Sequence, residues 1–423
     1  MSIWPRTDSD GIAIDPATGT ATQIKAQPHT SLPLTTHPCA IDIALHPLPP
    51  LAELARLWAE VEARAESTFF LSWSWIGPWL SQMPAGVEPR LLLARRGGEP
   101  VGLAVLCPRR RRRLGLLPGR CWMLHETGDR GYDRLFMEYN GILADRRFAD
   151  EVTEAALHWL GEGLTANDEL VLGGLTPAAE RAARRVAART GHSLQVRIAD
   201  SAQWVDLAPV RASGGDFRAG LGRNTRAAVN RSERLYRARG GLDYRVAATV
   251  EEALEVFAGL EVLHQAGWQA RGQAGAFANP AFRPFHEQLI ALGVPSGAVR
   301  LCRISAGGQP VGYLYNFVHR NRVLNYQGGF AFEADNRLKP GLLSHVLAIE
   351  DALARGEECY DFMSTPAGHK PLLSNAEQPM NWLTLGPDRV GRRVEAHCRR
   401  ARGLMVDVVK RSLRGWTAPA KGI

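Results

Sequence analysis

The stretch Asn336-Arg337-Leu338-Lys339-Pro340-Gly341 lies between a predicted strand, Arg322–Phe330, and a predicted helix, Gly341–Arg355. Pro340 suits the first turn of a helix, and Gly341 allows an anion to approach the backbone closely. The free N–H groups and the dipole of a helix start favour phosphate groups. The stretch therefore predicts a binding site for a ligand that carries phosphate groups, although Pro-Gly pairs also mark helix starts that bind no ligand.

Strands and helices continue to alternate on both sides of this stretch. In the second half, apolar patterns predict helices at Val250–Ala270 and Phe282–Leu292 and strands at Leu242–Ala247, Val299–Ile304, Pro310–His319 and Cys359–Met363. In the first half they predict helices at Leu51–Ala63, Leu71–Met83, Phe148–Leu160 and Pro177–Thr190. The strands predicted there are Ile41–Leu48, Arg90–Ala94, Pro100–Cys107, Cys121–His125, Glu169–Leu172, Leu194–Ile198 and Gln203–Leu207. The pattern indicates α/β lobes.

The two halves share a local motif that suggests an internal duplication. Gly97-Gly98-Glu99-Pro100-Val101-Gly102 and Gly307-Gly308-Gln309-Pro310-Val311-Gly312 each lie between two predicted strands. A Gly-Gly turn is what a tight antiparallel hairpin requires, so hairpin chemistry alone could account for part of the match.

We predict four segments. They are a disordered leader at 1–40, a first lobe at 41–208, a second lobe at 209–390 that includes a basic linker helix at 217–239, and a basic amphipathic segment at 391–423. The run Arg109–Arg113 follows a predicted strand, and we expect it to be a solvated loop. The less favoured alternative is that it binds anionic lipid or nucleic acid.

The composition is that of a globular protein with a positive charge. Lys and Arg number 51 against 43 Asp and Glu, giving a formal net charge of +8. Only five basic residues are lysines, and Lys339 and Lys370 are the two that lie away from the chain ends. The six cysteines are scattered without Cys-x-x-Cys spacing, so we expect neither a disulfide framework nor a metal site. With no signal peptide or apolar span, the expected location is the cytoplasm, with peripheral contact at the inner membrane as an alternative.

Several motifs of the second half resemble the CelD-like acetyltransferases, which are related to the Fem peptidyltransferases. The resemblance covers residues 215–385 and rests on Arg223-Asn224-Thr225-Arg226, Gly267-Trp268-Gln269-Ala270-Arg271-Gly272, Tyr326-Gln327-Gly328-Gly329-Phe330, Pro340-Gly341-Leu342-Leu343, Asp361-Phe362 and Lys370. It implies two tandem GNAT lobes (the acyl-CoA-dependent N-acyltransferase fold) and a link to exopolysaccharide or cell-envelope synthesis.

The resemblance also assigns roles to residues. In GNAT proteins the turn before the third helix holds the cofactor diphosphate, which here implies the cofactor-binding residues Arg337, Lys339, Gly341, Leu342 and Gln327. Helices that wall the acceptor site imply the substrate-binding residues Trp268, Arg271, His286 and Tyr326. Arg223 and Arg226 share one face of the basic helix and could clamp a phosphate, or form a solvated charged face.

For the catalytic groups we name Asp361, Lys370 and His369. Asp361, at the end of its strand, could accept the amine proton, and Lys370 could neutralise a phosphate or oxyanion, as the matching lysine in Fem-like relatives is thought to do. Glu333, Asp335, Ser364 and Thr365 stay open as alternatives.

The leading hypothesis is an acyltransferase that moves an acetyl or other acyl group from acyl-CoA to an amine, such as an amino sugar of an envelope glycan. One alternative is Fem-like transfer from aminoacyl-tRNA; no other nucleic acid is expected as a partner. Another is a degenerate protein that senses a nucleotide such as cyclic di-GMP through its basic segments, including 391–423. This last alternative arises because Gly341 falls one place late for the usual Arg/Gln-x-x-Gly-x-Gly/Ala signature, and Phe362-Met363-Ser364 replaces a tyrosine that many GNAT enzymes use.

Overall fold

The computed structural model describes residues 13–14, 21–22, 40–113, 117–364 and 370–389. Met1–Ala40 and Ile41–Ile423 form two separate compact units. In the first unit, β1 (Ala13–Ile14) pairs with β2 (Ala21–Thr22). Most of the predicted leader, the segment 391–423, Thr365 and His369 lie outside the described residues.

The first lobe follows the predicted order of elements. The residues at the two ends of α4 explain where this helix begins and ends. Thr176 caps the N-terminus of α4 by accepting a hydrogen bond from the Ala179 N–H, and Gly191 ends the helix with a φ of 64°. The elements are β3 (Ile41–Pro47), α1 (Leu51–Glu62), η1 (Phe69–Leu71), α2 (Trp73–Ser81), β4 (Arg90–Arg96), β5 (Glu99–Arg113), β6 (Leu117–Leu124), η2 (Tyr132–Leu135), β7 (Leu143–Ala144), α3 (Ala149–Glu162), β8 (Glu169–Leu175), α4 (Pro177–Thr190) and β9 (His192–Asp206).

The second lobe repeats this layout after a helical connection made of α5 (Leu207–Ala212), η3 (Arg218–Gly220) and α6 (Arg223–Arg237). Its elements are β10 (Leu242–Val246), α7 (Val250–Gln269), η4 (Ala276–Ala278), α8 (Phe282–Ser296), β11 (Val299–Ala306), β12 (Gln309–His319), β13 (Arg322–Phe330), α9 (Pro340–Ala354), β14 (Cys359–Asp361), α10 (Lys370–Leu373) and β15 (Ala376–Pro387). Both Gly-Gly turns connect hairpin strands and have positive φ at both glycines. The predicted α/β class with two similar lobes is confirmed.

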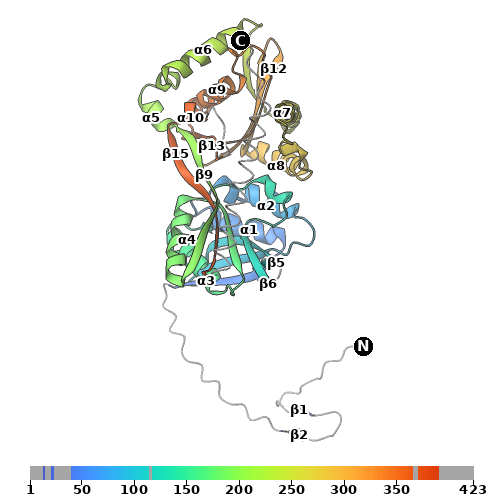
Figure 1. Cartoon of the computed structure of the whole chain (residues 1–423), viewed down its shortest axis with the longest axis vertical. Coiled ribbons are helices and arrows are strands. Elements are labelled where there is room, and N and C mark those ends of the chain that lie inside the picture. The colour runs from blue at the N-terminus through green and yellow to red at the C-terminus, as the bar shows by residue number, and fades with distance from the viewer. Residues whose placement is uncertain (1–12, 15–20, 23–39, 114–116, 365–369, 390–423) are drawn as a thin grey trace, which may run out of the picture. The chain divides into compact units, whose positions relative to one another are not determined.

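Within the described residues, thirteen strands form one continuous sheet with the order β10-β11-β12-β13-β14-β9-β15-β8-β6-β5-β4-β3, and β7 pairs with β5. β9 and β15 are long strands that run between the lobes (Figure 1). β9, the last strand of the first lobe, pairs with β14 of the second. In return, β15 pairs with β8 of the first lobe. The two lobes therefore exchange their closing strands.

Three parts of the sheet differ from the sequence predictions. Leu194–Ile198 and Gln203–Leu207 are not two strands but parts of β9, whose register with β15 shifts once near Arg197. β15 was not predicted, because its partners come from the other lobe. Arg109–Arg113 is not a loop: the arginines extend β5 and pair with β6.

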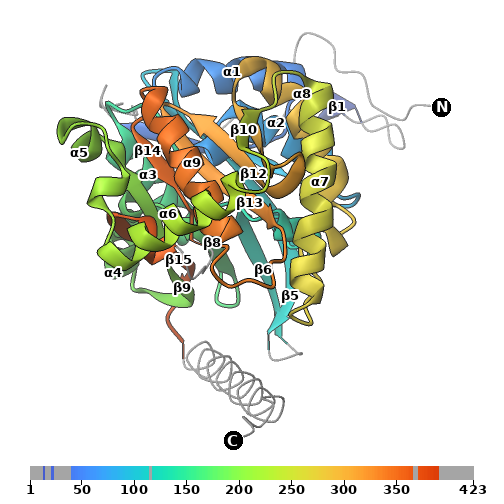
Figure 2. The same ribbon diagram turned by 90° about the horizontal axis from the view of Figure 1, so that it is seen from above.

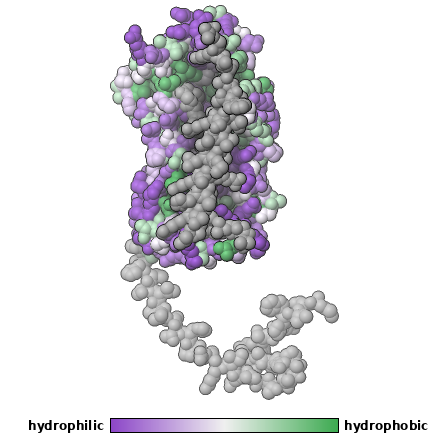
Figure 3. All heavy atoms as spheres, viewed as in Figure 1, coloured by the Kyte–Doolittle hydropathy of each residue, from purple (hydrophilic) through white to green (hydrophobic). Residues whose placement is uncertain are grey.

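Helices cover both faces of the second lobe's sheet. Leu301 and Tyr315 face the core that contains α7 and α8, whereas Cys302 and Leu314 face the core that contains α6 and α9. Figure 2 shows α6 and α9 on one side of β12 and β13 and α7 on the other. The face drawn in Figure 3 is largely hydrophilic outside its grey atoms, with small hydrophobic groups between. No helix within the described ranges is long and apolar enough to cross a bilayer.

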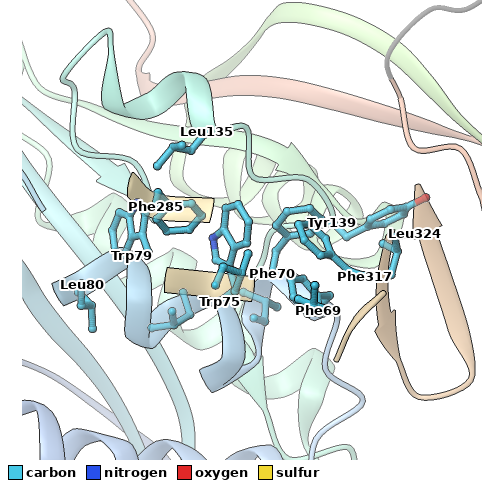
Figure 4. Close-up of a cluster of buried hydrophobic side chains, with 14 of the residues drawn as sticks. Phe69, Phe70, Trp75, Trp79, Leu80, Leu135, Tyr139, Phe285, Phe317 and Leu324 are labelled. Carbon is cyan, nitrogen blue, oxygen red and sulfur yellow. The ribbon is translucent and has the colours of Figure 1, made fainter. Parts of the chain in front are cut away.

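An aromatic cluster joins the lobes. Phe69 of η1 stacks on Phe317 of β12 with ring centroids 4.2 Å apart, and Trp75 of α2 meets Phe285 of α8 edge-on at 4.9 Å (Figure 4). All four side chains are at most 1% exposed. The interface is therefore packed like a protein interior.

We predict that Phe317→Ala lowers the free energy of unfolding by about 3–5 kcal/mol, because it leaves a cavity between the lobes. Denaturant unfolding followed by circular dichroism measures the change. Phe332→Ala is the control, because Phe332 is 92% exposed, and should change stability by less than about 0.5 kcal/mol. Equal, small effects of the two substitutions would contradict a packed interface.

Candidate functional site

The sheet opens between β13 and β14. The two strands pair in parallel only over Arg322–Leu324 and Cys359–Asp361, while β13 continues to Phe330. A cavity of about 510 Å³ lies at this opening. It is lined by residues of both lobes: Arg134, Phe136, Glu138, His264, Trp268, Gln273, Ala274, Gly275, Ala276, Asn279, Phe282, Asn325, Tyr326, Gln327, Gly328, Phe330, His345, Phe362, Met363 and Lys370.

Glu138 is the buried carboxylate of this cavity. The loop between η2 and β7 carries it, and it is 3% exposed. The Ser364 N–H donates to one carboxylate oxygen over 2.9 Å, and the Ser364 hydroxyl donates to the other over 2.7 Å. Burial raises the pKa of Glu138 to about 7, although the two hydrogen bonds oppose the rise. Such a carboxylate can both accept and release a proton near neutral pH.

Lys370 is the buried cation of the same cavity. Its Nζ donates to the carbonyl oxygens of Phe362, over 2.5 Å, and Met363, over 3.1 Å. Burial lowers the pKa of Lys370 to about 8, while the charges of Glu138 and Asp361 act in the opposite direction. Because an ammonium group has three donors, one remains for a ligand in the cavity.

The backbone beside these two groups is strained. Phe136, Tyr139 and Met363 have φ values of 42°, 51° and 60°, a region that non-glycine residues seldom occupy. Phe136 lies two residues before Glu138, Tyr139 follows Glu138 directly, and Met363 precedes Ser364. Strain of this kind costs about 1–3 kcal/mol per residue and clusters at functional sites.

The structure does not support the prediction that Asp361 is the general base. Asp361 is fully buried and does not line the cavity. One of its oxygens accepts hydrogen bonds from the Tyr139 hydroxyl at 2.6 Å and the Arg322 guanidinium at 2.9 Å, and the other accepts from the Met363 N–H at 2.7 Å. The Asp361 carboxylate thus holds Tyr139 and Met363, which lie on the two sides of the site, in position.

The alternative bases lie elsewhere. Glu333 accepts hydrogen bonds from Arg239 and Tyr236, and Asp335 pairs with Arg337. Ser364 holds Glu138. His369 and Thr365 lie outside the described residues, so their predicted roles stay predictions.

Three of the predicted cofactor residues, Lys339, Gly341 and Leu342, line a groove of about 580 Å³. Its other lining residues are Asn224, Thr225, Ala228, Pro340 and Leu372. The groove joins the N-terminal ends of α6 and α9, so the free N–H groups of two helix starts lie beside it. We refer to it as the donor groove.

The other two predicted cofactor residues, Gln327 and Arg337, do not line the donor groove. Gln327 lines the cavity rather than the donor groove. Arg337 forms an exposed ion pair with Asp335 and lines neither space. A Cβ atom at Gly341 would lie 3.3 Å from the Phe330 ring, so this glycine also serves close packing.

The predicted substrate residues divide similarly. Trp268 and Tyr326 line the cavity, and the Tyr326 hydroxyl donates to the Leu135 carbonyl at 2.5 Å. The exposed Arg271 guanidinium lies 4.6 Å from the Trp268 ring centroid and does not line the cavity. His286 does not line it either: it is fully buried, its Nδ1 is 3.1 Å from the Tyr315 hydroxyl, and burial holds its pKa well below the ordinary value.

Arg223 and Arg226 stand at the start of α6. Arg223 is exposed, and Arg226 donates to the Ala219 carbonyl over 3.1 Å. Their neighbours Asn224 and Thr225 line the donor groove, but the two arginines do not. Their predicted phosphate contacts therefore stay a prediction.

The corresponding opening in the first lobe is filled by its own side chains. β6 and β8 pair in parallel over Cys121–Leu124 and Glu169–Leu172. Directly after the paired part of β6, His125 is fully buried and forms a hydrogen bond with Asn140. Glu126, the next residue, packs against Gly173. The open cavity therefore lies at the sheet opening of the second lobe, where residues of both lobes line it.

Sequence analysis missed Glu138, because no motif marks it. The signal that could have drawn attention to it is the run Glu138-Tyr139-Asn140, three polar residues in an otherwise apolar segment between predicted elements. All three are at most 4% exposed.

We predict that Ser364→Ala raises the pKa of Glu138, because it removes a donor that favours the charged carboxylate. Infrared titration of the carboxyl band, assigned by its loss in Glu138→Gln, measures the pKa. Ser296→Ala, at an exposed serine, should leave it unchanged. An unchanged or lower pKa in Ser364→Ala would contradict the geometry of the pair.

A family model described as an acetyltransferase (GNAT) domain matches residues 223–371. Among solved structures, FemX is similar with a TM-score of 0.52 and 12% identity, over 81% of this chain and 96% of that chain. L-PGS from Bacillus licheniformis has a TM-score of 0.46 and 10% identity, over 84% of this chain and 97% of that chain. A tandem GNAT protein from the clavulanic acid biosynthesis pathway has a TM-score of 0.41 and 14% identity, over 82% and 100%. No curated protein matches the chain by sequence.

The family match includes α6, Lys370 and every lining residue of the donor groove except Leu372, whereas Glu138 lies outside it. The likeness to FemX concerns the fold alone, and the closer resemblance to CelD-like proteins stays a prediction. The chain shares its α/β fold with FemX, and residues 223–371 of its second lobe are similar to the acetyltransferase (GNAT) domain.

Proposed function

We propose that this protein transfers an acyl group from acyl-CoA to an amine, with Glu138 as the general base. The observation that carries the proposal is the pairing of Glu138 and Lys370 in one cavity where the sheet opens. One group has its pKa raised toward neutrality and the other has its pKa lowered. Perturbed acid–base groups in a cleft are typical of catalytic sites.

The donor would lie with its diphosphate in the donor groove and its thioester in the cavity. The start of α9 borders the groove, and the side chain of Phe330 contacts Gly341 there while also lining the cavity. Phe330 therefore lies between the two spaces. Two helix starts and Lys339 would neutralise the diphosphate.

In the reaction, the neutral amine nitrogen attacks the thioester carbonyl carbon and a C–N bond forms. The amine proton passes to the Glu138 carboxylate, either directly or through a water molecule. The ammonium group of Lys370 stabilises the oxyanion with its remaining donor. The C–S bond then breaks, and the leaving thiolate takes the proton that Glu138 accepted, which restores the Glu138 carboxylate. No covalent enzyme intermediate is required.

The acceptor site would be the part of the cavity between Trp268, Phe282 and Tyr326. Aromatic faces suit the apolar face of a sugar ring. We therefore propose an amino sugar of an exopolysaccharide or envelope glycan precursor as the acceptor. For the location we propose the cytoplasm, with peripheral contact at the inner membrane as an alternative. Aminoacyl-tRNA as donor is the rival, and it predicts activity that ribonuclease abolishes.

We predict that Glu138→Gln lowers kcat by about 10²–10⁴, because no base then accepts the amine proton. The test is acetyl-CoA turnover against a panel of amino sugars, with Glu377→Gln, at an exposed position, as the control. If Glu138→Gln retained full kcat, the proposed role of Glu138 would be wrong, even if the protein were an acyltransferase.

The pH profile of kcat/KM should be narrow and bell-shaped. Activity rises with pH as Glu138 loses its proton near pH 7 and falls as Lys370 loses its proton near pH 8. Because the two groups interact, the measured values belong to the pair. Lys370→Met should remove the alkaline limb, and its persistence in this variant would assign that limb to another group.

Donor binding should depend on the donor groove. We expect Lys339→Ala to weaken acetyl-CoA binding about tenfold, or ~1.4 kcal/mol, in calorimetric titration. Arg303→Ala removes the same charge from an exposed position on β11 and should have little effect. If the unaltered protein did not bind acetyl-CoA, this result would contradict the proposal that the donor is an acyl-CoA.

A further inference from the structure

A second basic site lies in the first lobe, away from the cavity. The run Arg109–Arg113 extends β5 and pairs with β6, so that Arg110 lies directly opposite Arg120. Like charges that face each other on neighbouring strands destabilise a sheet. Neither side chain forms a salt bridge within the part of the chain that the structure describes. Asp168, which accepts a hydrogen bond from the Arg120 N–H, is an acid beside this pair.

The arginines beside this pair are held in place. The Arg109 guanidinium donates to the Gly128 carbonyl over 3.1 Å. Arg111, two residues further, pairs with Glu169, which is 2% exposed. Alternate members of the run therefore stabilise the hairpin, while Arg110 stays available to a ligand.

A groove of about 810 Å³ lies over the Arg110–Arg120 pair. Its lining residues are Gly86, Glu88, Arg90, Pro108, Arg109, Arg110, Arg120 and Trp122. Four arginines thus face one carboxylate, Glu88, which lies 3.8 Å from Arg90 and is largely exposed. The surplus of positive charge favours an anion with more than one negative charge.

The groove also has a flat apolar face. The Arg120 guanidinium carbon lies over the Trp122 ring, 5.5 Å from its centroid, so a base stacks on Trp122 only when Arg120 turns from the ring to the phosphates. A guanidinium fork suits the paired oxygens of phosphate, and an indole ring beside it suits a stacked planar base. Lipid head groups supply the phosphate but not the planar ring.

We propose that this groove binds a nucleoside diphosphate, with Arg110 and Arg120 on the phosphates and Trp122 against the base. The site is separate from the donor groove, whose lining residues all belong to the second lobe. Its occupation would relieve the repulsion across the β5–β6 hairpin and so stabilise the first lobe. The proposal does not depend on the acyltransferase reaction.

The test is calorimetric titration of the full chain with GDP and with pyrophosphate, in the absence of CoA because CoA itself carries an adenosine diphosphate group. Arg110→Ala/Arg120→Ala should weaken both ligands at least about tenfold, because two charge-assisted contacts are lost. Trp122→Leu should weaken GDP about fivefold or more and leave pyrophosphate unchanged, because stacking concerns the base alone. Lys339→Ala should change neither.

Arg112→Ala is the matched control, since Arg112 belongs to the same run, is exposed and does not line the groove. It should change both affinities less than about twofold, because Arg112 makes no charge-assisted hydrogen bond to the ligand. Equal losses in Arg112→Ala and in the double variant would mean general charge attraction and would overturn the site. Failure of the unaltered protein to bind GDP, or binding only to vesicles of phosphatidylglycerol, would also overturn it.

Discussion

The antiparallel ladder between β9 and β15 is the constraint on which the arrangement of the two lobes depends. It runs from the pair Trp204–Ala376 to the pair His192–Pro387. Because β9 also pairs with β14 and β15 also pairs with β8, each lobe is completed by a strand of the other. Moving the lobes apart would break backbone hydrogen bonds in the middle of a continuous sheet and expose the aromatic cluster around Phe317.

This ladder brings together the groups that we assign to the reaction. Glu138 comes from the first lobe and Ser364 from the second, 226 residues later, yet Ser364 donates two hydrogen bonds to Glu138. A carboxylate and an ammonium group are each costly to bury alone, and here each lowers the cost of burying the other. The strained backbone at Tyr139 and Met363 persists because Asp361 binds both residues.

Features that depend on local sequence could be predicted: the helices, the Gly-Gly hairpins and the α9 start with Lys339 and Gly341. Features that depend on distant partners could not. β15 contains Pro379 and Asn381, which weaken its strand pattern, and its partners lie in the other lobe. Glu138 lies in a loop whose position depends on the same exchange. Asp361 was predicted as the base because its strand end borders the site, but its partners Tyr139 and Arg322 occupy it.

The central claim is that one reaction centre is assembled from both lobes at the opening between β13 and β14. A crystal structure with a non-hydrolysable acetyl-CoA analogue tests it most directly. The account predicts the diphosphate at the start of α9 and the acyl carbonyl in the cavity between Glu138 and Lys370. An analogue bound in the first lobe, or one whose carbonyl lay beyond reach of both side chains, would contradict it.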